Sequence, residues 1–192
     1  MTKPLKDMKV AILVDDLFEQ AELEEPKKAL EAAGVTVHIV APKGPTVTGM
    51  KHHDQGDSFQ VSVLLDQARV EDYDGLVLPG GVVNVDVLRM NERAQAFARA
   101  IDEAGKPLAV VCHGPWLLVS AGLADGRTLT SWPSLQDDLR NAGATWVDKE
   151  VVSDANWTSS RQPADLPAFN RAFLAALQRA PTKALDTMPI AD

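Results

Sequence analysis

The stretch that decides the fold is Lys106-Pro107-Leu108-Ala109-Val110-Val111-Cys112-His113-Gly114-Pro115-Trp116-Leu117-Leu118. It begins with an apolar run that is typical of a buried strand. It ends in a helical segment whose first turn holds a proline, where the missing N–H would be unpaired in any case. The stretch therefore predicts a strand that turns sharply into a helix, with Cys112 at the turn.

The pattern of strand followed by helix recurs along the chain. Further strands are predicted at residues 9–14, 35–40, 73–78, 144–147, 151–152 and 156–159. Helices are predicted before Gly34, over 91–104 and 135–142, and after Asp165, which is expected to cap the last one. Continuous apolar strands alternating with helices favour an α/β fold, with a mostly parallel sheet covered on both faces. The polar segment 46–60 is expected to be an excursion outside the core.

Composition limits the class of protein. The chain has 192 residues, with 27 acidic against 19 basic side chains. We expect 1–192 to form a single domain, with 181–192 a mobile tail. An acidic chain without a Lys/Arg cluster is not expected to bind nucleic acid. Its apolar runs are too short to span a membrane and its N-terminus lacks a secretory core, so a cytoplasmic location is predicted.

The single cysteine excludes an internal disulfide and a cysteine zinc site, so Cys112 matters as a thiol if it matters at all. Ligands of open parallel sheets bind at the carboxyl ends of strands, and the predicted turn resembles a nucleophile elbow. The helix N-terminus is expected to lower the thiol pKa. His113 is a candidate proton carrier. The alternatives are a buried structural cysteine and a packing histidine.

Two acids, Glu19 and Glu22, are three residues apart at the predicted start of the first helix. This spacing places them on one face, near the end of the first strand. They are candidates to orient a water molecule or to hydrogen-bond the cysteine, because burial can keep a glutamic acid protonated beside a thiolate. The alternative is that acids simply favour helix N-termini.

Three further features are candidates for the pocket. Gly80 and Gly81 leave backbone N–H groups free for an oxyanion site, although a tight exit from the strand explains the pair equally well. The tryptophans are interpreted as core residues, with Trp116 also a candidate to line the pocket. His52-His53-Asp54, together with Asp57, has the residue types of a metal site but not its spacing, so a solvated loop is favoured and no metal is expected.

Several motifs match a known family in order along the chain. They are Phe18-Glu19-Gln20-Ala21-Glu22-Leu23, Val111-Cys112-His113-Gly114-Pro115 and the segments 74–81, 104–107, 126–131, 141–148, 159–161 and 165–169. With these motifs the sequence resembles the DJ-1/PfpI superfamily, in its PfpI-like branch (peptidase family C56). The resemblance implies a flavodoxin-like three-layer sandwich, with Cys112 as nucleophile, Glu22 as the acid that contacts it and Glu19 as the neighbouring acid. His113 matches the PfpI-like branch.

The resemblance also implies a homo-oligomer. In proteins of the PfpI type, an acid shortly after the Gly-Gly pair can complete a catalytic triad in the adjoining subunit, and the nearest acid here is Asp86. No metal or organic cofactor is implied. The downstream His-x-Glu of glutamine amidotransferases is missing from the sequence.

The leading hypothesis is a stress-protective cysteine enzyme of glyoxalase or deglycase type. The Cys112 thiolate would attack small reactive aldehydes such as methylglyoxal, or their adducts on proteins, while Glu22 and His113 move protons. Backbone N–H groups of Gly80, Gly81 and Gly114 would hold the oxyanion. One alternative is an intracellular peptidase or amidase that uses Cys112 and His113. Another is a redox sensor or chaperone-like stress protein oxidised at Cys112.

Overall fold

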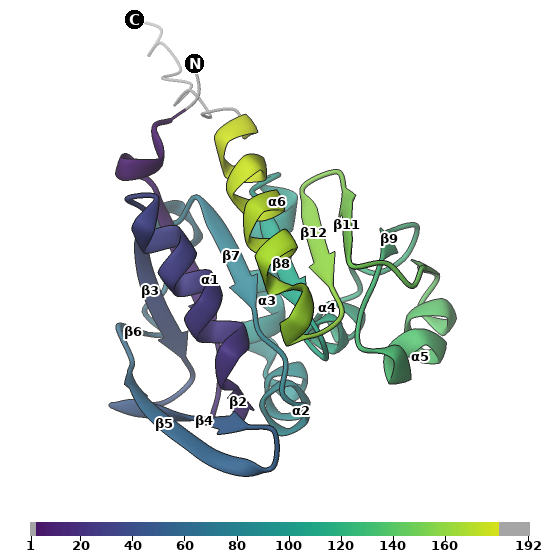
Figure 1. Cartoon of the computed structure of the whole chain (residues 1–192), viewed down its shortest axis with the longest axis horizontal. Coiled ribbons are helices and arrows are strands. Elements are labelled where there is room, and N and C mark those ends of the chain that lie inside the picture. The colour runs from purple at the N-terminus through teal and green to yellow at the C-terminus, as the bar shows by residue number, and fades with distance from the viewer. Residues whose placement is uncertain (1–2, 181–192) are drawn as a thin grey trace, which may run out of the picture.

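A seven-stranded sheet forms the centre of the computed structural model, which describes residues 3–180 (Figure 1). The predicted tail 181–192 lies outside the described residues. Along the sheet, the strands are β11 (Val151–Asp154), β12 (Trp157–Ser160), β8 (Leu108–Val111), β7 (Gly75–Leu78), β1 (Lys9–Leu13), β3 (Thr36–Ala41) and β6 (Val63–Leu64). Strand β11 pairs antiparallel with β12, and the other neighbouring pairs are parallel. The mostly parallel α/β sheet is therefore confirmed.

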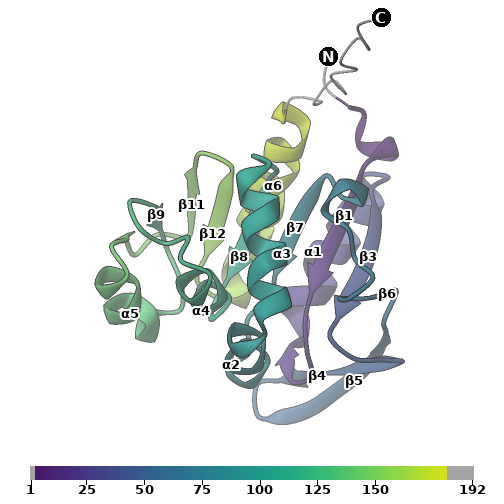
Figure 2. The same cartoon turned by 180° about the vertical axis from the view of Figure 1, so that it is seen from behind.

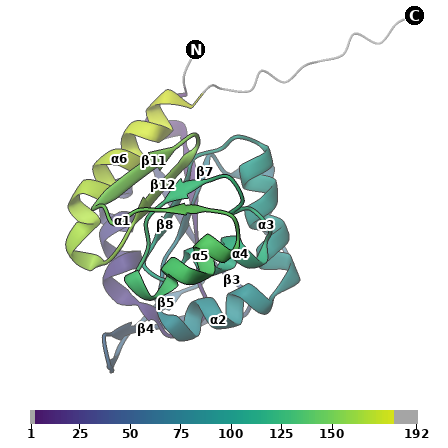
Figure 3. The same ribbon diagram turned by 90° about the vertical axis from the view of Figure 1, so that its right-hand side faces the viewer.

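Helices cover both faces of this sheet. They are α1 (Gln20–Ala32), α2 (Val82–Met90), α3 (Glu92–Glu103), α4 (Pro115–Ser120), α5 (Gln136–Asn141) and α6 (Leu166–Arg179). Helices α1 and α6 lie on one face, and α2, α3 and α4 lie on the other (Figures 1 and 2). Seen from the side, the three layers of the sandwich separate clearly (Figure 3). In the part of the chain described, no helix is long and apolar enough to cross a membrane.

The sheet divides the core into two clusters, because neighbouring residues of a strand point to opposite faces. In β1, Val10 and Ile12 pack in the cluster under α1 and α6, whereas Ala11 and Leu13 pack in the other. All four are fully buried. Strands buried on both faces are continuously apolar, which is why the sequence pattern located them.

Helix α6 confirms its predicted apolar stripe but not its predicted cap. Leu166, Phe169, Phe173 and Leu177 are buried, and Leu174 packs against them. The Asp165 side chain makes no capping hydrogen bond. It accepts two hydrogen bonds from Arg161, at 2.8 and 3.1 Å, because a guanidinium is a stronger, charge-assisted donor than a backbone N–H.

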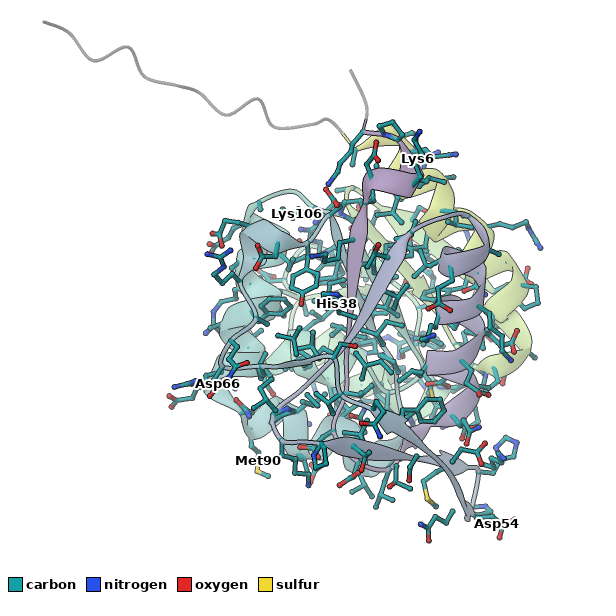
Figure 4. The ribbon with its side chains drawn as sticks, turned by 90° about the vertical axis from the view of Figure 1, so that its left-hand side faces the viewer. Lys6, His38, Asp54, Asp66, Met90 and Lys106 are labelled. Atoms are coloured by element: carbon teal, nitrogen blue, oxygen red, sulfur yellow. The ribbon has the colours of Figure 1, made fainter. Side chains whose placement is uncertain are left out.

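The expectation that 46–60 lies outside the core is only partly right, because most of the segment is exposed but Val47 is buried. This segment forms a hairpin of β4 (Thr46–Lys51) and β5 (Asp54–Gln60), and β2 (Phe18–Glu19) pairs with β4. Val47 is fully buried, and the rings of Phe18 and Phe59 are in edge contact with centroids 5.6 Å apart. Burial along β4 alternates as in a half-buried strand, whereas β5 is mostly exposed. Its tip at Asp54 extends from the same end of the molecule as Met90 of α2 (Figure 4).

Shorter elements complete the described chain. A two-stranded parallel sheet joins β9 (Thr128–Leu129) and β10 (Thr145–Trp146). Single 3-10 turns occur at Leu5–Asp7, Val70–Asp72, Pro133–Leu135 and Pro163–Asp165. Helix α2 and strands β6 and β9 have no counterpart among the sequence predictions.

Candidate active site

The predicted elbow is present between β8 and α4. Cys112 has a φ of +60°, a left-handed backbone conformation that is uncommon for residues other than glycine. Its N–H donates to the carbonyl oxygen of Ser160 at 3.1 Å, and its own carbonyl oxygen accepts from the N–H of Trp132 at 2.9 Å. Pro115 occupies the first turn of α4 as expected. The strained residue is therefore held from both sides by the surrounding chain.

The Gly-Gly pair at the end of β7 lets three segments approach the thiol. A Cβ on Gly80 would lie 2.8 Å from the Cβ of Cys112 and 2.7 Å from Oε2 of Glu22. Gly81 has a φ of +84°, and a Cβ there would lie 2.6 Å from the carbonyl oxygen of Leu17. Both glycines are required by close packing against the elbow and the segment before α1.

Glu22 lies under the elbow and is fully buried. Its Oε2 accepts a hydrogen bond of 2.7 Å from the N–H of Gly80. Burial raises the pKa of Glu22 to about 8, and the negative charge of Glu19 adds to this effect, while hydrogen bonds with Gly80 and Cys112 oppose it. At neutral pH the side chain is therefore a protonated acid. This agrees with the sequence-based hypothesis of a glutamic acid that stays protonated and hydrogen-bonds the cysteine.

The expectation that the helix lowers the thiol pKa is wrong. Burial raises the pKa of Cys112, and an ionised Glu22 beside it raises that pKa further, while the N–H groups of His113 and Gly81 act in the opposite direction. These two backbone N–H groups do not outweigh the effects of burial and of Glu22. The Cys112 thiol and the Glu22 carboxyl titrate as a coupled pair. While Glu22 keeps its proton it carries no negative charge, so it does not oppose a thiolate on Cys112.

The His113 ring is mostly buried beside the sulfur. Its Nδ1 lies 3.2 Å from Sγ of Cys112. The edge of Trp116 contacts it at a centroid distance of 5.2 Å, and Trp132 stacks on it at 6.1 Å. Burial lowers the pKa of His113, so the ring is neutral at pH 7 and can accept a proton.

The structure corrects the predicted oxyanion donors. The Gly80 N–H is engaged by Glu22, and the Gly114 N–H donates to the carbonyl oxygen of Val111 at 2.9 Å. Neither is free for a substrate. The N–H groups that interact with the sulfur are those of Gly81 and His113. A backbone site of two donors therefore remains, built from the predicted Gly81 and from His113.

A cleft of about 980 Å³ opens above the thiol. Its lining comprises Leu17, Glu19, Glu22, Met50, His52, His53, Gly81, Val82, Val83, Cys112, His113, Trp132, Gln162, Pro163 and Ala164. Trp116 does not line it, because its ring packs behind His113. Trp132, predicted as core, is 38% exposed and takes that place.

The hairpin supplies a wall of this cleft that sequence reasoning missed. His52 and His53 are exposed, as the predicted solvated loop requires, and they also line the cleft. The N–H of His52 donates to Oε2 of Glu19 at 3.2 Å. The alternating pattern at the start of this segment signals a strand, but nothing in the sequence indicates that the hairpin tip lies at the cleft. Within residues 3–180, no three His, Cys, Asp or Glu side chains are grouped to hold a metal ion.

Asp86 is not part of the site within one chain. It lies on α2, exposed, and does not line the cleft. Its neighbours on the outer side of that helix include Val82, Val83, Val87 and Met90, which are 40% to 71% exposed.

The fold is a flavodoxin-like sandwich, and its cysteine elbow lies against a buried acid. Together these features are typical of a cysteine enzyme of the DJ-1/PfpI type. The chain belongs to the DJ-1/PfpI family, whose family model matches residues 8–176. Deglycase PH1704 of Pyrococcus horikoshii is 46% identical over 171 residues, which are 89% of this chain and all of that protein. YraA of Bacillus subtilis, which bears a provisional cysteine-protease name, is 40% identical over 88% of this chain and 98% of its own length.

The solved structures agree with this assignment. Drosophila melanogaster DJ-1beta superposes with a TM-score of 0.82 at 26% identity, covering 93% of this chain and 91% of that one. The predicted flavodoxin-like fold and the PfpI-like branch are both confirmed.

Proposed function

We propose that the chain is a cofactor-independent cysteine enzyme that acts on α-oxoaldehydes such as methylglyoxal, or on their adducts with protein amines and thiols. The observation that carries the proposal is the thiol of Cys112 lying between a buried, protonated Glu22 and a neutral His113. Relatives named deglycases, at 43% to 46% identity, support the same reaction class.

The first step is addition of the thiol to the aldehyde. Sγ of Cys112 bonds to the aldehyde carbon, its proton passes to Nδ1 of His113, and the carbonyl π bond breaks. The oxygen that gains charge is stabilised by the N–H groups of Gly81 and His113 and takes a proton from Glu22. The product is a hemithioacetal. With a hemiaminal or hemithioacetal adduct as substrate, Sγ instead displaces the amine or thiol of the protein: the C–N or C–S bond breaks, the leaving group takes the thiol proton through His113, and the same hemithioacetal forms.

The second stage converts the hemithioacetal into a hydroxy acid. A base removes the C1 proton to give an enediol, and a proton returns to C2, leaving a thioester. Glu22 as carboxylate and His113 are the groups placed to carry these protons. Water then cleaves the thioester and releases Cys112. Methylglyoxal plus water equals lactate, so the sum needs no oxidant or reductant.

The test is lactate formation from methylglyoxal by wild type, Cys112→Ser and Glu22→Gln, with the release of methylglyoxal adducts from a peptide measured in parallel. Both variants are expected to lose activity. Activity that survives the loss of the thiol would refute the proposal.

A peptidase or amidase is the second candidate, favoured by the 3.2 Å contact between Sγ of Cys112 and Nδ1 of His113. The provisional name of YraA supports the same reading. In a peptidase, His113 carries the proton from the thiol to the leaving amine. Hydrolysis of unmodified peptides by wild type, without turnover of methylglyoxal, would favour this candidate.

We further propose that the chain acts as a homo-oligomer in a cytoplasmic, reducing environment. The exposed apolar side chains of α2 at the cleft mouth support a contact with a second copy, which would bring Asp86 of one subunit toward the cleft of another. A reducing compartment keeps the thiol free. Light scattering of wild type and Val87→Asp tests the contact. Asp86→Asn should lower activity only if the oligomer forms.

A further inference from the structure

The charge of the cleft is one-sided. Its lining contains the carboxyl groups of Glu19 and Glu22, the thiol and three histidines, but no lysine or arginine among the described residues. The remaining surface is apolar or uncharged. Glu22, beneath the thiol, is protonated at neutral pH, so the Glu19 carboxylate is the negative group at the cleft wall.

Cationic side chains on the neighbouring elements are engaged elsewhere. Lys51, beside the hairpin tip, pairs with Asp57 at 3.2 Å. Arg89 of α2 lies over the Trp116 ring at 5.3 Å and donates to Ser120 at 3.0 Å. Neither lines the cleft, so neither neutralises the negative charge of Glu19 at short range.

Glu19 is held at the cleft wall and does not point freely into solvent. It lies in β2, which pairs with β4 of the hairpin, and its side chain is 15% exposed. Its Oε2 accepts from the His52 N–H at 3.2 Å, and Nδ1 of His52 lies 3.8 Å away. A carboxylate fixed in a partly desolvated wall acts more strongly on a ligand charge than one in water.

We propose that Glu19 is a specificity-determining residue that makes this cleft select carbonyl substrates by charge. Uncharged and cationic carbonyl compounds are accepted, including adducts on lysine- or arginine-rich segments. Aldehydes that carry a carboxylate or a phosphate are excluded. This selectivity rests on the proposed function, since it describes the substrates of the same thiol.

The charge itself is measurable without turnover, because Cys112 is the only cysteine. Intact-mass measurements give the rates at which neutral iodoacetamide and anionic iodoacetate alkylate the wild-type protein. The rate with iodoacetamide is divided by the rate with iodoacetate. This ratio is then normalised to the same ratio for the free thiol N-acetylcysteinamide. We expect a normalised ratio of about ten or more for wild type, and a severalfold lower one for Glu19→Gln. Met50→Lys, which adds a cation to the cleft wall, should lower it without altering Glu19.

Glu25→Gln is the matched control. Glu25 lies on α1, exposed and paired with Lys28 at 3.3 Å, and does not line the cleft. Its loss changes the net charge equally but should leave the ratio unchanged. A wild-type ratio equal to that of the free thiol, or equal shifts in Glu19→Gln and Glu25→Gln, would overturn the proposal.

Turnover gives the second readout. Phenylglyoxal, 4-carboxyphenylglyoxal and 4-(trimethylammonio)phenylglyoxal share one reactive group and differ in charge. Wild type should use the first and third at least about tenfold better than the second, mainly through KM, and Glu19→Gln should narrow the gap. Equal use of all three contradicts charge selection. If none is turned over, the proposed function fails, and the alkylation ratio still decides whether the cleft selects by charge.

Discussion

The elbow and the hairpin tip face the same cleft but are built in opposite ways. Cys112 and Glu22 are 7% and 0% exposed, and their backbone and side-chain groups are tied to the central sheet and its loops. His52 and His53 are exposed at the tip of the β4–β5 hairpin, which we call the arm. The comparison indicates a division of roles: the core sets the chemistry of the thiol, and the arm adjusts which molecules reach it.

The largest effect is expected from the thiol. Cys112→Ser keeps the shape of the elbow but replaces the thiol with a far weaker nucleophile, so the rate of lactate formation should fall by at least about 10³-fold. His53→Ala, on the arm, should change kcat by less than about threefold. Comparable losses in both variants would contradict the division of roles.

Backbone packing at the elbow is the next test. A Cβ on Gly114 would lie 2.6 Å from the carbonyl oxygen of Leu78, and backbone cannot yield cheaply. Gly114→Ala should therefore cost about 3 kcal/mol or more in urea unfolding. Gly44, just before the hairpin, is the matched control: its Cβ would meet Leu64 at an ordinary 3.4 Å, and Gly44→Ala should cost less than about 1 kcal/mol. Equal costs would show that the elbow is no tighter than the arm.

The pH dependence of stability tests the buried acid. The pKa of Glu22 is about 8 in the folded chain and 4.5 when unperturbed. Between these values the folded state binds the extra proton, so rising pH destabilises wild type relative to Glu22→Gln, by up to about 1.4 kcal/mol per pH unit. In urea unfolding, the difference in unfolding free energy between wild type and Glu22→Gln should change by roughly 2–3 kcal/mol from pH 5.5 to pH 7.5. Glu25→Gln should show none; a flat difference for Glu22→Gln would mean that this carboxyl is ionised.

The smallest effect is expected where the arm meets α1. Gln20 donates to Oδ2 of Asp57 at 2.6 Å and accepts from the Asp57 N–H at 2.8 Å. Gln20→Ala should cost about 1–2 kcal/mol and raise KM severalfold, with faster hydrogen exchange confined to the hairpin. Gln55→Ala, exposed on β5, is the control. An effect on kcat as large as that on KM would show that the arm contributes to the chemical step and not only to substrate binding.

Much of this arrangement could be predicted from the chain. The strands around Ile12, Val77 and Val110 are continuously apolar, and the turn at Cys112 carries its own proline signal. The positions of Glu19 and Glu22 in the cleft also agree with the family resemblance. These features depend on local sequence, or on residues that directly follow a strand.

The errors concern groups whose surroundings come from distant segments. The N–H of Gly80 was predicted to be free, but Glu22, 58 residues earlier, accepts from it. Trp132 reaches the cleft instead of Trp116 because its N–H is bonded to the elbow carbonyl. The thiol pKa is raised because burial and the neighbouring Glu22 outweigh the N–H groups of His113 and Gly81.

The sequence by itself determined the α/β class, the single thiol and its place at a strand-to-helix turn, since apolar periodicity and proline act within a few residues. Only the tertiary structure decided that Glu22 is protonated, which donors face the sulfur and that His52 and His53 line the cleft. Desolvation and hydrogen-bond partnership depend on what packs against a group, and here the packing groups come from strands and loops far apart in the chain.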